Sequence, residues 1–201
     1  MRNVIIFDIV GVLRIYNNDS FNDWLKTTFH ISNDIKPIWK KWQDLRDIDE
    51  LNEHEFYSNF LKDVAISESK LPEELFYKKF FEDCVRDDEK ILKFIEYNLY
   101  GKYRLYIFSN FSRIDLKKYR EKFDFEKFFD KCVYSCDIKV KKPNIEFFEK
   151  GLKIIDHNGN ECIFFDDQLK SKTNSEKVGI KFIQYLNYDQ FIKDLDVLET
   201  K

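Results

Sequence analysis

The chain has 201 residues, of which 43% are hydrophobic and 17% aromatic, and its net charge is −3. This apolar content is enough for a packed core and excludes a disordered chain, and the length suits one domain or a domain that carries an insertion. Basic and acidic residues are mixed throughout, so the sequence has no basic footprint for nucleic acid or for an anionic membrane.

The sequence has no apolar run of 18 residues and no basic-then-apolar leader at its start. Its four cysteines form no CxxC pair, and its three histidines lack metal-ligand spacing, so no zinc site is indicated. We therefore expect a reduced, cytoplasmic protein that binds neither nucleic acid nor membrane. No pattern in the sequence indicates an oligomeric state.

The first predicted element is a short buried strand at residues 4–7 (VIIF), which places Asp8 in a glycine turn. Almost 100 residues separate this strand from the next one, although a crossover needs only a dozen or more. Residues 17–85 have helical spacing of aromatic side chains throughout. We interpret them as an inserted helical domain of about four helices, and residues 1–16 and 86–201 as one α/β domain.

Beyond the insertion, short apolar strands alternate with helices. Continuous apolar runs with this alternation are typical of a parallel sheet that is covered on both faces. The sequence therefore predicts an α/β fold with a Rossmann-like parallel sheet of about five strands flanked by helices. The predicted strands after the first are 104–109, 131–135, 162–165 and 181–185, and the predicted helices are 87–98, 113–123, 144–154 and 188–198.

Polar residues stand at the ends of the predicted strands. In an open α/β sheet, ligands bind beyond the carboxyl ends of the strands, so these residues are expected to meet at one edge. Each of them has an ordinary structural explanation by itself, as a helix cap, a turn residue or a surface lysine, but their occurrence in order at four strands indicates a site. They are Asp8, Ser109, Asn110, Lys142, Asp166 and Asp167.

The segments that carry these residues resemble the four motifs of the haloacid dehalogenase superfamily. They are "VIIFDIVGVL", "LYIFSN", "SCDIKVKKPNIEFF" and "CIFFDDQLKSKTNSEKVGIKFIQY". Most members of this family are Mg²⁺-dependent phosphatases with an aspartate nucleophile, and the inserted helices resemble the family's C1 cap. The resemblance implies a hydrolase with a capped Rossmann-like core that acts on a small phosphorylated metabolite.

The chemistry of the residues agrees with these roles. A carboxylate that attacks phosphorus divides hydrolysis into two steps through an aspartyl-phosphate, and Asp8 is the candidate nucleophile. Three carboxylates and an anionic substrate need a cation, for which Mg²⁺ is the usual solution. We expect Asp8, Asp167 and the carbonyl of Val10 to bind it, with Asp166 acting directly or through water.

Other residues are expected to bind the substrate. Lys142 would neutralise Asp8 and the phosphoryl oxygens, and Ser109 would donate a hydrogen bond to one of these oxygens. Asn110 and Arg14 are further candidates for substrate contact. A structural lysine in an ion pair at a helix start is the alternative reading of Lys142.

Val10 departs from the family pattern, which has a second acid at this position. In the family's phosphatases that acid protonates the leaving group and later activates water, and valine does neither. General acid–base catalysis contributes roughly 10²–10⁴-fold, so we expect slowed hydrolysis unless a neighbour such as Arg14 or Tyr16 substitutes. Two alternatives stay open: a catalytically weak or inactive binding or regulatory protein, and a 2-haloacid dehalogenase-like hydrolase, whose halide leaving group needs no proton.

Overall fold

The computed structural model describes residues 4–16, 18–122 and 125–199. Its centre is a parallel sheet with the strand order β5-β4-β1-β6-β7. Neighbouring strands start in near register, with Val4 opposite Arg104 on one side and opposite Cys162 on the other. The strands are β1 (Val4–Phe7), β4 (Arg104–Ser109), β5 (Lys131–Tyr134), β6 (Cys162–Asp166) and β7 (Lys181–Gln184).

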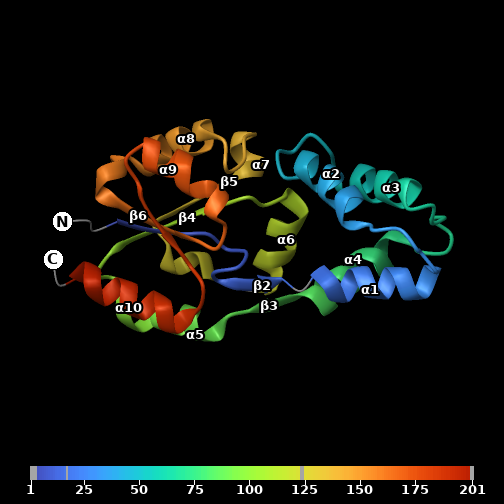
Figure 1. Ribbon diagram of the computed structural model, residues 1–201, viewed down its shortest axis with the longest axis horizontal. Coiled ribbons are helices and arrows are strands. Elements are labelled where there is room, and N and C mark those ends of the chain that lie inside the picture. Colours follow the sequence, from blue (N-terminus) through green and yellow to red (C-terminus); the bar gives the residue numbers. More distant parts are fainter. Residues whose placement is uncertain (1–3, 17, 123–124, 200–201) are drawn as a thin grey trace.

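Helices cover both faces of this sheet (Figure 1). Alternate residues of each strand enter different clusters: Ile5 and Phe7 pack toward one face, and Val4 and Ile6 toward the other. The first face is covered by α5 (Glu89–Phe94), α6 (Arg113–Lys122) and α10 (Tyr188–Glu199), and the second by α8 (Ile145–Ile155) and α9 (Lys172–Lys177). The short helix α7 (Ser135–Ile138) follows β5. The predicted α/β fold with a Rossmann-like parallel sheet is therefore confirmed.

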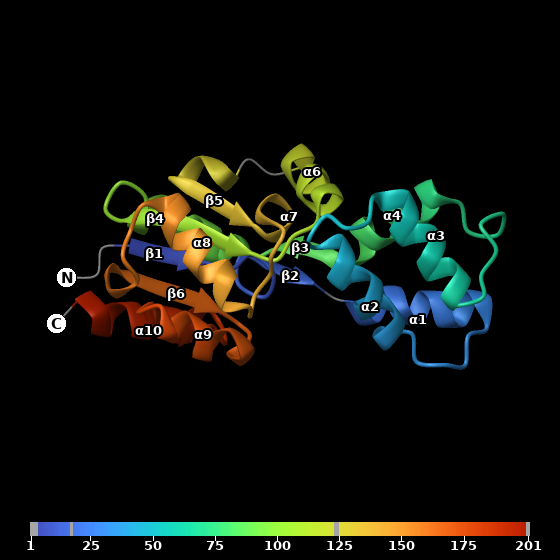
Figure 2. The same ribbon diagram turned by 90° about the horizontal axis from the view of Figure 1, so that it is seen from above.

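Four further helices form a lobe at one end of the molecule, away from both termini (Figure 2). They are α1 (Asn18–Phe29), α2 (Lys36–Arg46), α3 (Glu53–Asp63) and α4 (Glu73–Cys84), and we call residues 18–84 the helical lobe. Trp39, Phe56, Phe60 and Phe76 pack at its centre, in a hydrophobic cluster of its own that also takes in Ile114 of α6. Helical spacing of aromatic residues in the sequence thus marks buried faces of this lobe.

Two short strands join the helical lobe to the sheet domain. Strand β2 (Arg14–Tyr16) pairs antiparallel with β3 (Val85–Asp87), so the chain enters and leaves the lobe through one narrow ribbon. The sequence did not predict this ribbon, because each strand has only three residues. Strand β3 also shortens the predicted helix 87–98: Asp88 caps the N-terminus of α5, and residues Ile95–Leu99 continue it as a π-helix.

Polar contacts also hold the helical lobe against the sheet domain. Arg46 at the end of α2 forms an ion pair with Asp115 of α6, with Nη2 and Oδ2 2.9 Å apart and both side chains buried. The Ser135 hydroxyl donates a hydrogen bond of 2.6 Å to the carbonyl of Asp47. These contacts place the end of α2 beside the carboxyl edge of the sheet. Among the described residues, no helix is both long enough and apolar enough to cross a membrane.

Candidate active site

Asp8 lies directly beyond β1, at the carboxyl edge of the sheet, and is almost fully buried. Its Oδ1 accepts hydrogen bonds of 2.7 Å from the backbone N–H of Ile9 and from the hydroxyl of Ser109. Its Oδ2 lies 2.9 Å from Nζ of Lys142. Burial raises the pKa of Asp8, and the carboxylate of Asp166 adds to this, whereas Lys142 and Ser109 favour the ionised form.

Lys142 is the cation at the centre of the site. Its Nζ lies 2.7 Å from Oδ2 of Asp166 as well as 2.9 Å from Asp8, and the side chain is 3% exposed. Burial would lower the pKa of Lys142, but the two carboxylates outweigh it and raise the pKa. The side chain of Asn110 fixes the backbone at this position, since it accepts from the Lys142 N–H at 2.8 Å and donates to the Lys142 carbonyl at 2.9 Å.

Asp166 and Asp167 differ in their environments. Oδ1 of Asp166 accepts a hydrogen bond of 2.7 Å from the N–H of Gln168, so both of its oxygens are occupied. Oδ1 of Asp167 is buried and has no hydrogen-bond partner among the described residues. Burial, together with the carboxylates of Asp8 and Asp166, raises the pKa of Asp167 to about 7. Asp167 thus lies beside Asp8 and Asp166 with one oxygen that has no hydrogen-bond partner in the described part of the chain.

Gly11 makes room for Asp167. Its φ of +87° belongs to the left-handed region that favours glycine. A Cβ at this position would lie 2.4 Å from Cγ of Asp167, which is closer than real Cβ contacts come. Glycine is therefore required at residue 11, because a side chain there would keep the carboxylate of Asp167 away from the loop that carries Val10.

The residues of this edge fit a divalent cation. Asp8, Asp166 and Asp167 each offer a carboxylate oxygen, and these oxygens lie within 4.8 Å of one another. Hard cations such as Mg²⁺ prefer oxygen ligands, and the unpartnered oxygen of Asp167 provides one. Val10 lines the same cavity, and its carbonyl as a ligand stays a prediction.

Arg14 lies elsewhere than the sequence led us to expect. Its side chain is buried, and its guanidinium stacks over the ring of Tyr119 with Cζ 3.5 Å from the centroid. It is not among the residues that line the cavity at Asp8, so its position gives no support to substrate contact or proton transfer. Tyr16 belongs to β2, but its side chain lies outside the described part of the structure.

A cavity of about 620 Å³ opens over the site, between the sheet domain and the helical lobe. From the site, the sheet domain contributes Asp8, Val10, Asn110, Lys142 and Asp166, and it adds Lys141 and Lys170. The helical lobe contributes an apolar wall and several charged groups that have no counterpart in any motif of the sequence. The lining residues from the lobe are Asp19, Phe21, Asn22, Lys36, Trp39, Lys40, Gln43, Asp44 and Phe80, and Asp47 follows α2.

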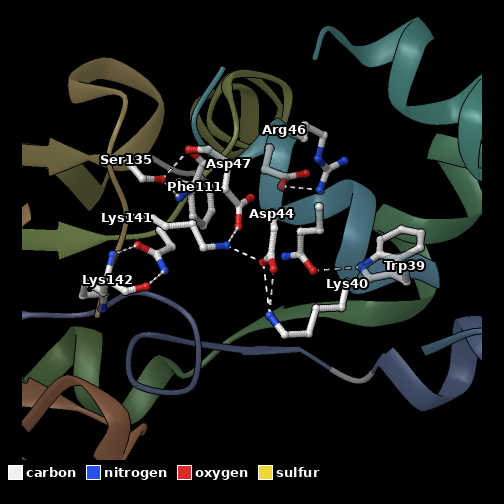
Figure 3. A network of polar contacts seen from close by, with 12 residues as sticks. Trp39, Lys40, Asp44, Arg46, Asp47, Phe111, Ser135, Lys141 and Lys142 are labelled. Atoms are coloured by element: carbon white, nitrogen blue, oxygen red, sulfur yellow. Dashed lines mark hydrogen bonds and ion pairs between the residues drawn. The ribbon is translucent and has the colours of Figure 1, made fainter. Parts of the chain in front are cut away.

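A polar network connects α2 with the segment before Lys142 (Figure 3). Asp44 accepts hydrogen bonds from Lys40 and from Lys141, and Lys141 lies 3.6 Å from Oδ2 of Asp47. Burial raises the pKa of Asp47 to about 6, against the opposing effect of Lys141 and Arg46, and Asp115 and Asp44 raise it further. Burial would also raise the pKa of Asp44, but hydrogen bonds from Lys141 and Lys40 outweigh it and lower the pKa.

Asp47 predicts a pH dependence of stability. Its folded-state pKa of about 6 exceeds the ordinary value of about 3.9, so the native protein holds a proton that the unfolded chain has lost. The contribution of Asp47 to the free energy of unfolding is therefore complete below about pH 4 and is lost as the pH rises through about 6. A pKa shift of about two units corresponds to roughly 2–3 kcal/mol. Relative to the wild type, Asp47→Asn should therefore lose less stability between pH 4 and 7, measured by urea unfolding.

Asp44→Asn is the matched control, because its lowered pKa gives the opposite sign: the contribution of Asp44 is present above about pH 4 and is lost on acidification. Parallel pH profiles of the wild type and Asp47→Asn would contradict the assignment of a raised pKa to Asp47.

Comparison with solved structures shows the same fold. A HAD family enzyme of Bacteroides thetaiotaomicron, in complex with magnesium and inorganic phosphate, has a TM-score of 0.80 at 18% identity, over 92% of this chain and 94% of that one. A predicted HAD-like hydrolase of Porphyromonas gingivalis has a TM-score of 0.79 at 20% identity, over 100% and 99% of the two chains. L-2-haloacid dehalogenase of Xanthobacter autotrophicus has a TM-score of 0.63 at 14% identity, over 98% and 83%.

Two curated proteins are similar in sequence. A drimenol cyclase of Aspergillus calidoustus is 28% identical over 116 residues, which are 56% of this chain and 22% of that protein. A sesquiterpene phosphatase of Aspergillus oryzae is 31% identical over 98 residues, which are 48% of this chain and 50% of that protein. The matches span at most about half the length of these relatives.

A family model described as haloacid dehalogenase-like hydrolase matches residues 5–185, from β1 to the end of β7. The match includes every strand-end residue of the site, and the solved structures share the fold that brings these residues together. The chain therefore belongs to the haloacid dehalogenase-like hydrolases.

Proposed function

We propose that the chain is a Mg²⁺-dependent phosphatase that hydrolyses a small phosphorylated metabolite through an aspartyl-phosphate on Asp8. One observation carries this proposal: three carboxylates and one buried lysine meet at the carboxyl edge of the sheet, and an oxygen of Asp167 is left without a partner. Similarity to a sesquiterpene phosphatase and to a structure that holds magnesium and phosphate supports the same reaction.

Asp8 is positioned to act as the nucleophile. Ser109, Lys142 and the N–H of Ile9 hold its carboxylate in one orientation, which reduces the entropy that attack must overcome. A carboxylate oxygen forms a bond to phosphorus as the ester P–O bond breaks, and the electron pair leaves with the ester oxygen. Water then attacks the phosphorus of the aspartyl-phosphate, which releases phosphate and restores Asp8.

The surrounding residues would control charge during both steps. Mg²⁺ bound by Asp8, Asp167 and Asp166 would offset the charge of the phosphoryl group. Lys142 already lies between two carboxylates, and the phosphoryl group of the substrate would be its third anionic partner. Ser109 would share its hydroxyl donor between Asp8 and the phosphoryl group.

We propose that the helical lobe acts as the cap. In this division residues 17–85 form the cap domain, and residues 1–16 and 86–201 form the α/β core domain. Its separate hydrophobic cluster and the narrow β2–β3 ribbon support this division. Phe21, Trp39 and Phe80 give the cavity an apolar wall on the lobe side, which would suit the carbon skeleton of an organic phosphate.

The first prediction for the proposed function concerns the reaction itself. p-Nitrophenyl phosphate and acetyl phosphate should be hydrolysed only when Mg²⁺ is present, and Asp8→Asn should abolish turnover while its circular dichroism spectrum stays unchanged. Asp189→Asn, an exposed aspartate on α10, is the control and should keep full activity. Halide release from 2-chloropropionate without any metal dependence would instead favour the dehalogenase alternative.

Gly11 gives a second prediction, for the metal. In Gly11→Ala the new methyl group displaces the carboxylate of Asp167, so Mg²⁺ affinity should fall by roughly 10–100-fold, measured from the Mg²⁺ dependence of turnover and of the melting temperature. Gly101→Ala is a matched control, because Gly101 has a similar φ of +78° but nothing within 4 Å of the added Cβ.

Both glycine variants should lose about 1–3 kcal/mol of stability from backbone strain, but only Gly11→Ala should lose affinity for Mg²⁺. Equal Mg²⁺ affinity in the two variants would show that Asp167 is not a ligand.

Val10 gives a third prediction, for proton transfer. An acid restored at this position by Val10→Asp should raise the rate on alkyl phosphates by about tenfold or more, because an alkoxide is a poor leaving group without a proton. The rate on p-nitrophenyl phosphate should change little. In the control Val10→Asn, asparagine has the same shape as aspartate but cannot act as the acid, so the rate on alkyl phosphates should not rise. A rise with asparagine would show that the polarity of the side chain, and not proton transfer, causes the effect.

The same experiment separates the proposal from a binding or regulatory role. If no phosphate ester or acyl phosphate is hydrolysed by the wild type or by Val10→Asp, while Mg²⁺ and phosphate still raise the melting temperature, the chain is a binding protein and the proposed phosphatase activity is wrong.

A further inference from the structure

Lysine side chains from three separate segments line the cavity, in addition to the residues of the reaction site. Lys40 comes from α2, Lys141 precedes Lys142, and Lys170 lies in the 3₁₀ turn Leu169–Ser171. All three line the same cavity as Asp8. Figure 3 shows the ammonium groups of Lys40 and Lys141 both directed at the carboxylate of Asp44, from two different directions.

The charges of this group do not cancel. Asp44 is shared between Lys40 and Lys141, and Asp47 lies 3.6 Å from Lys141. Lys170 has no ion pair or hydrogen bond with any residue that the structure describes. Asp166 also acts on Lys170, but it is already paired with Lys142. Within this group three ammonium groups therefore face two carboxylates, of which Asp47 has a pKa raised to about 6.

The electrostatics of Lys170 agree with this arrangement. Lys170 is exposed at the edge of the cavity, and the partial burial of its ammonium group lowers its pKa. The nearby ammonium groups of Lys40, Lys141 and Lys142 lower it further, against the opposing effect of Asp166. Like charges that approach one another in a cavity raise the energy of the free protein, and a bound anion removes that cost. The excess positive charge thus has the properties of an anion subsite.

We propose that Lys40, Lys141 and Lys170 form a subsite for a second anionic group of the substrate, a phosphate or a carboxylate at the end of the carbon skeleton remote from Asp8. This inference rests on the proposed phosphatase function for the group that reacts, and it adds the substrate class: phosphate esters that carry two anionic groups. The apolar wall of Phe21, Trp39 and Phe80 lines the same cavity and would contact the carbon skeleton between them.

The subsite also joins the two parts of the molecule. Lys40 belongs to the helical lobe, whereas Lys141 and Lys170 belong to the sheet domain. An anion held by all three therefore contacts both sides of the cavity at once. A substrate without the second anionic group would leave these contacts unmade, which is a basis for specificity.

The test measures binding with ligands that do not react. Alkyl phosphonates of three to eight carbons are titrated calorimetrically into the full chain with Mg²⁺, beside α,ω-bisphosphonates and ω-phosphonocarboxylates of the same lengths. The C–P bond resists hydrolysis, so binding is measured whether or not the protein turns over esters. At the best chain length a doubly anionic ligand should bind at least about tenfold more tightly than the alkyl phosphonate, and this ratio should fall as salt is raised.

Substitutions locate the second contact. Lys170→Gln should reduce the ratio of the two affinities by about five- to tenfold, and Lys170→Arg should preserve most of it. Lys172→Gln is the matched control, because Lys172 is an exposed lysine two residues away that does not line the cavity. Its ratio should equal that of the wild type.

The proposal is overturned if singly and doubly anionic ligands bind within twofold at every length, or if Lys170→Gln keeps the wild-type ratio. Turnover of alkyl phosphates separates it from the phosphatase function. If alkyl phosphates are hydrolysed but doubly anionic ligands bind no more tightly than singly anionic ones, the phosphatase function stands and the subsite is wrong. If doubly anionic ligands bind more tightly but no ester is hydrolysed, the subsite stands and the phosphatase function is wrong. If no ligand binds and no ester is hydrolysed, both are wrong.

Discussion

The ammonium group of Lys142, held between the carboxylates of Asp8 and Asp166, is the interaction on which the rest of the site depends. All three side chains are almost completely buried, and buried charges are tolerated only when they are paired. One lysine cannot neutralise a third carboxylate, so Asp167 keeps a raised pKa and an unpartnered oxygen. A carboxylate in this position is stabilised by a proton or by a further cation, and the proposed Mg²⁺ would supply that positive charge. Gly11 is part of the same constraint, because it lets Asp167 come close.

The cavity has two chemically different sides. The carboxyl edge of the sheet contributes carboxylates around one lysine, and this side is built from rigid strands with matched register. Lys40 and the apolar wall come from the helical lobe, beside Lys141 and Lys170 of the sheet domain. Under the proposed function, the carboxylates at the sheet edge would serve the reaction, and the lysine group and the apolar wall, which come from both parts of the molecule, would serve recognition.

Val10 shows that metal binding and proton transfer at this position are separate properties. A metal contact through a backbone carbonyl needs no particular side chain, whereas proton transfer needs an acid. The structure retains the acidic cluster and lacks an acid at residue 10, and the polar neighbour Arg14 is stacked on Tyr119 instead of facing the cavity. For the proposed phosphatase reaction, these residues favour leaving groups that depart without a proton, which would limit the range of esters more than the reaction itself.

The sequence by itself determined the five strands, the strand-end residues and the helical insertion, because periodicity and turn residues act over a few positions. The first two strands were located to the residue, and the others to within one residue. Tertiary structure alone decided the β2–β3 ribbon, the burial of Arg14 and the meeting of Asp44 with Lys141, which are 97 positions apart. Such pairings leave no local pattern, since each partner alone resembles an ordinary surface residue. The acidic cluster at the strand ends was therefore readable from the sequence, and the contacts of α2 with Lys141 on the other side of the cavity were not.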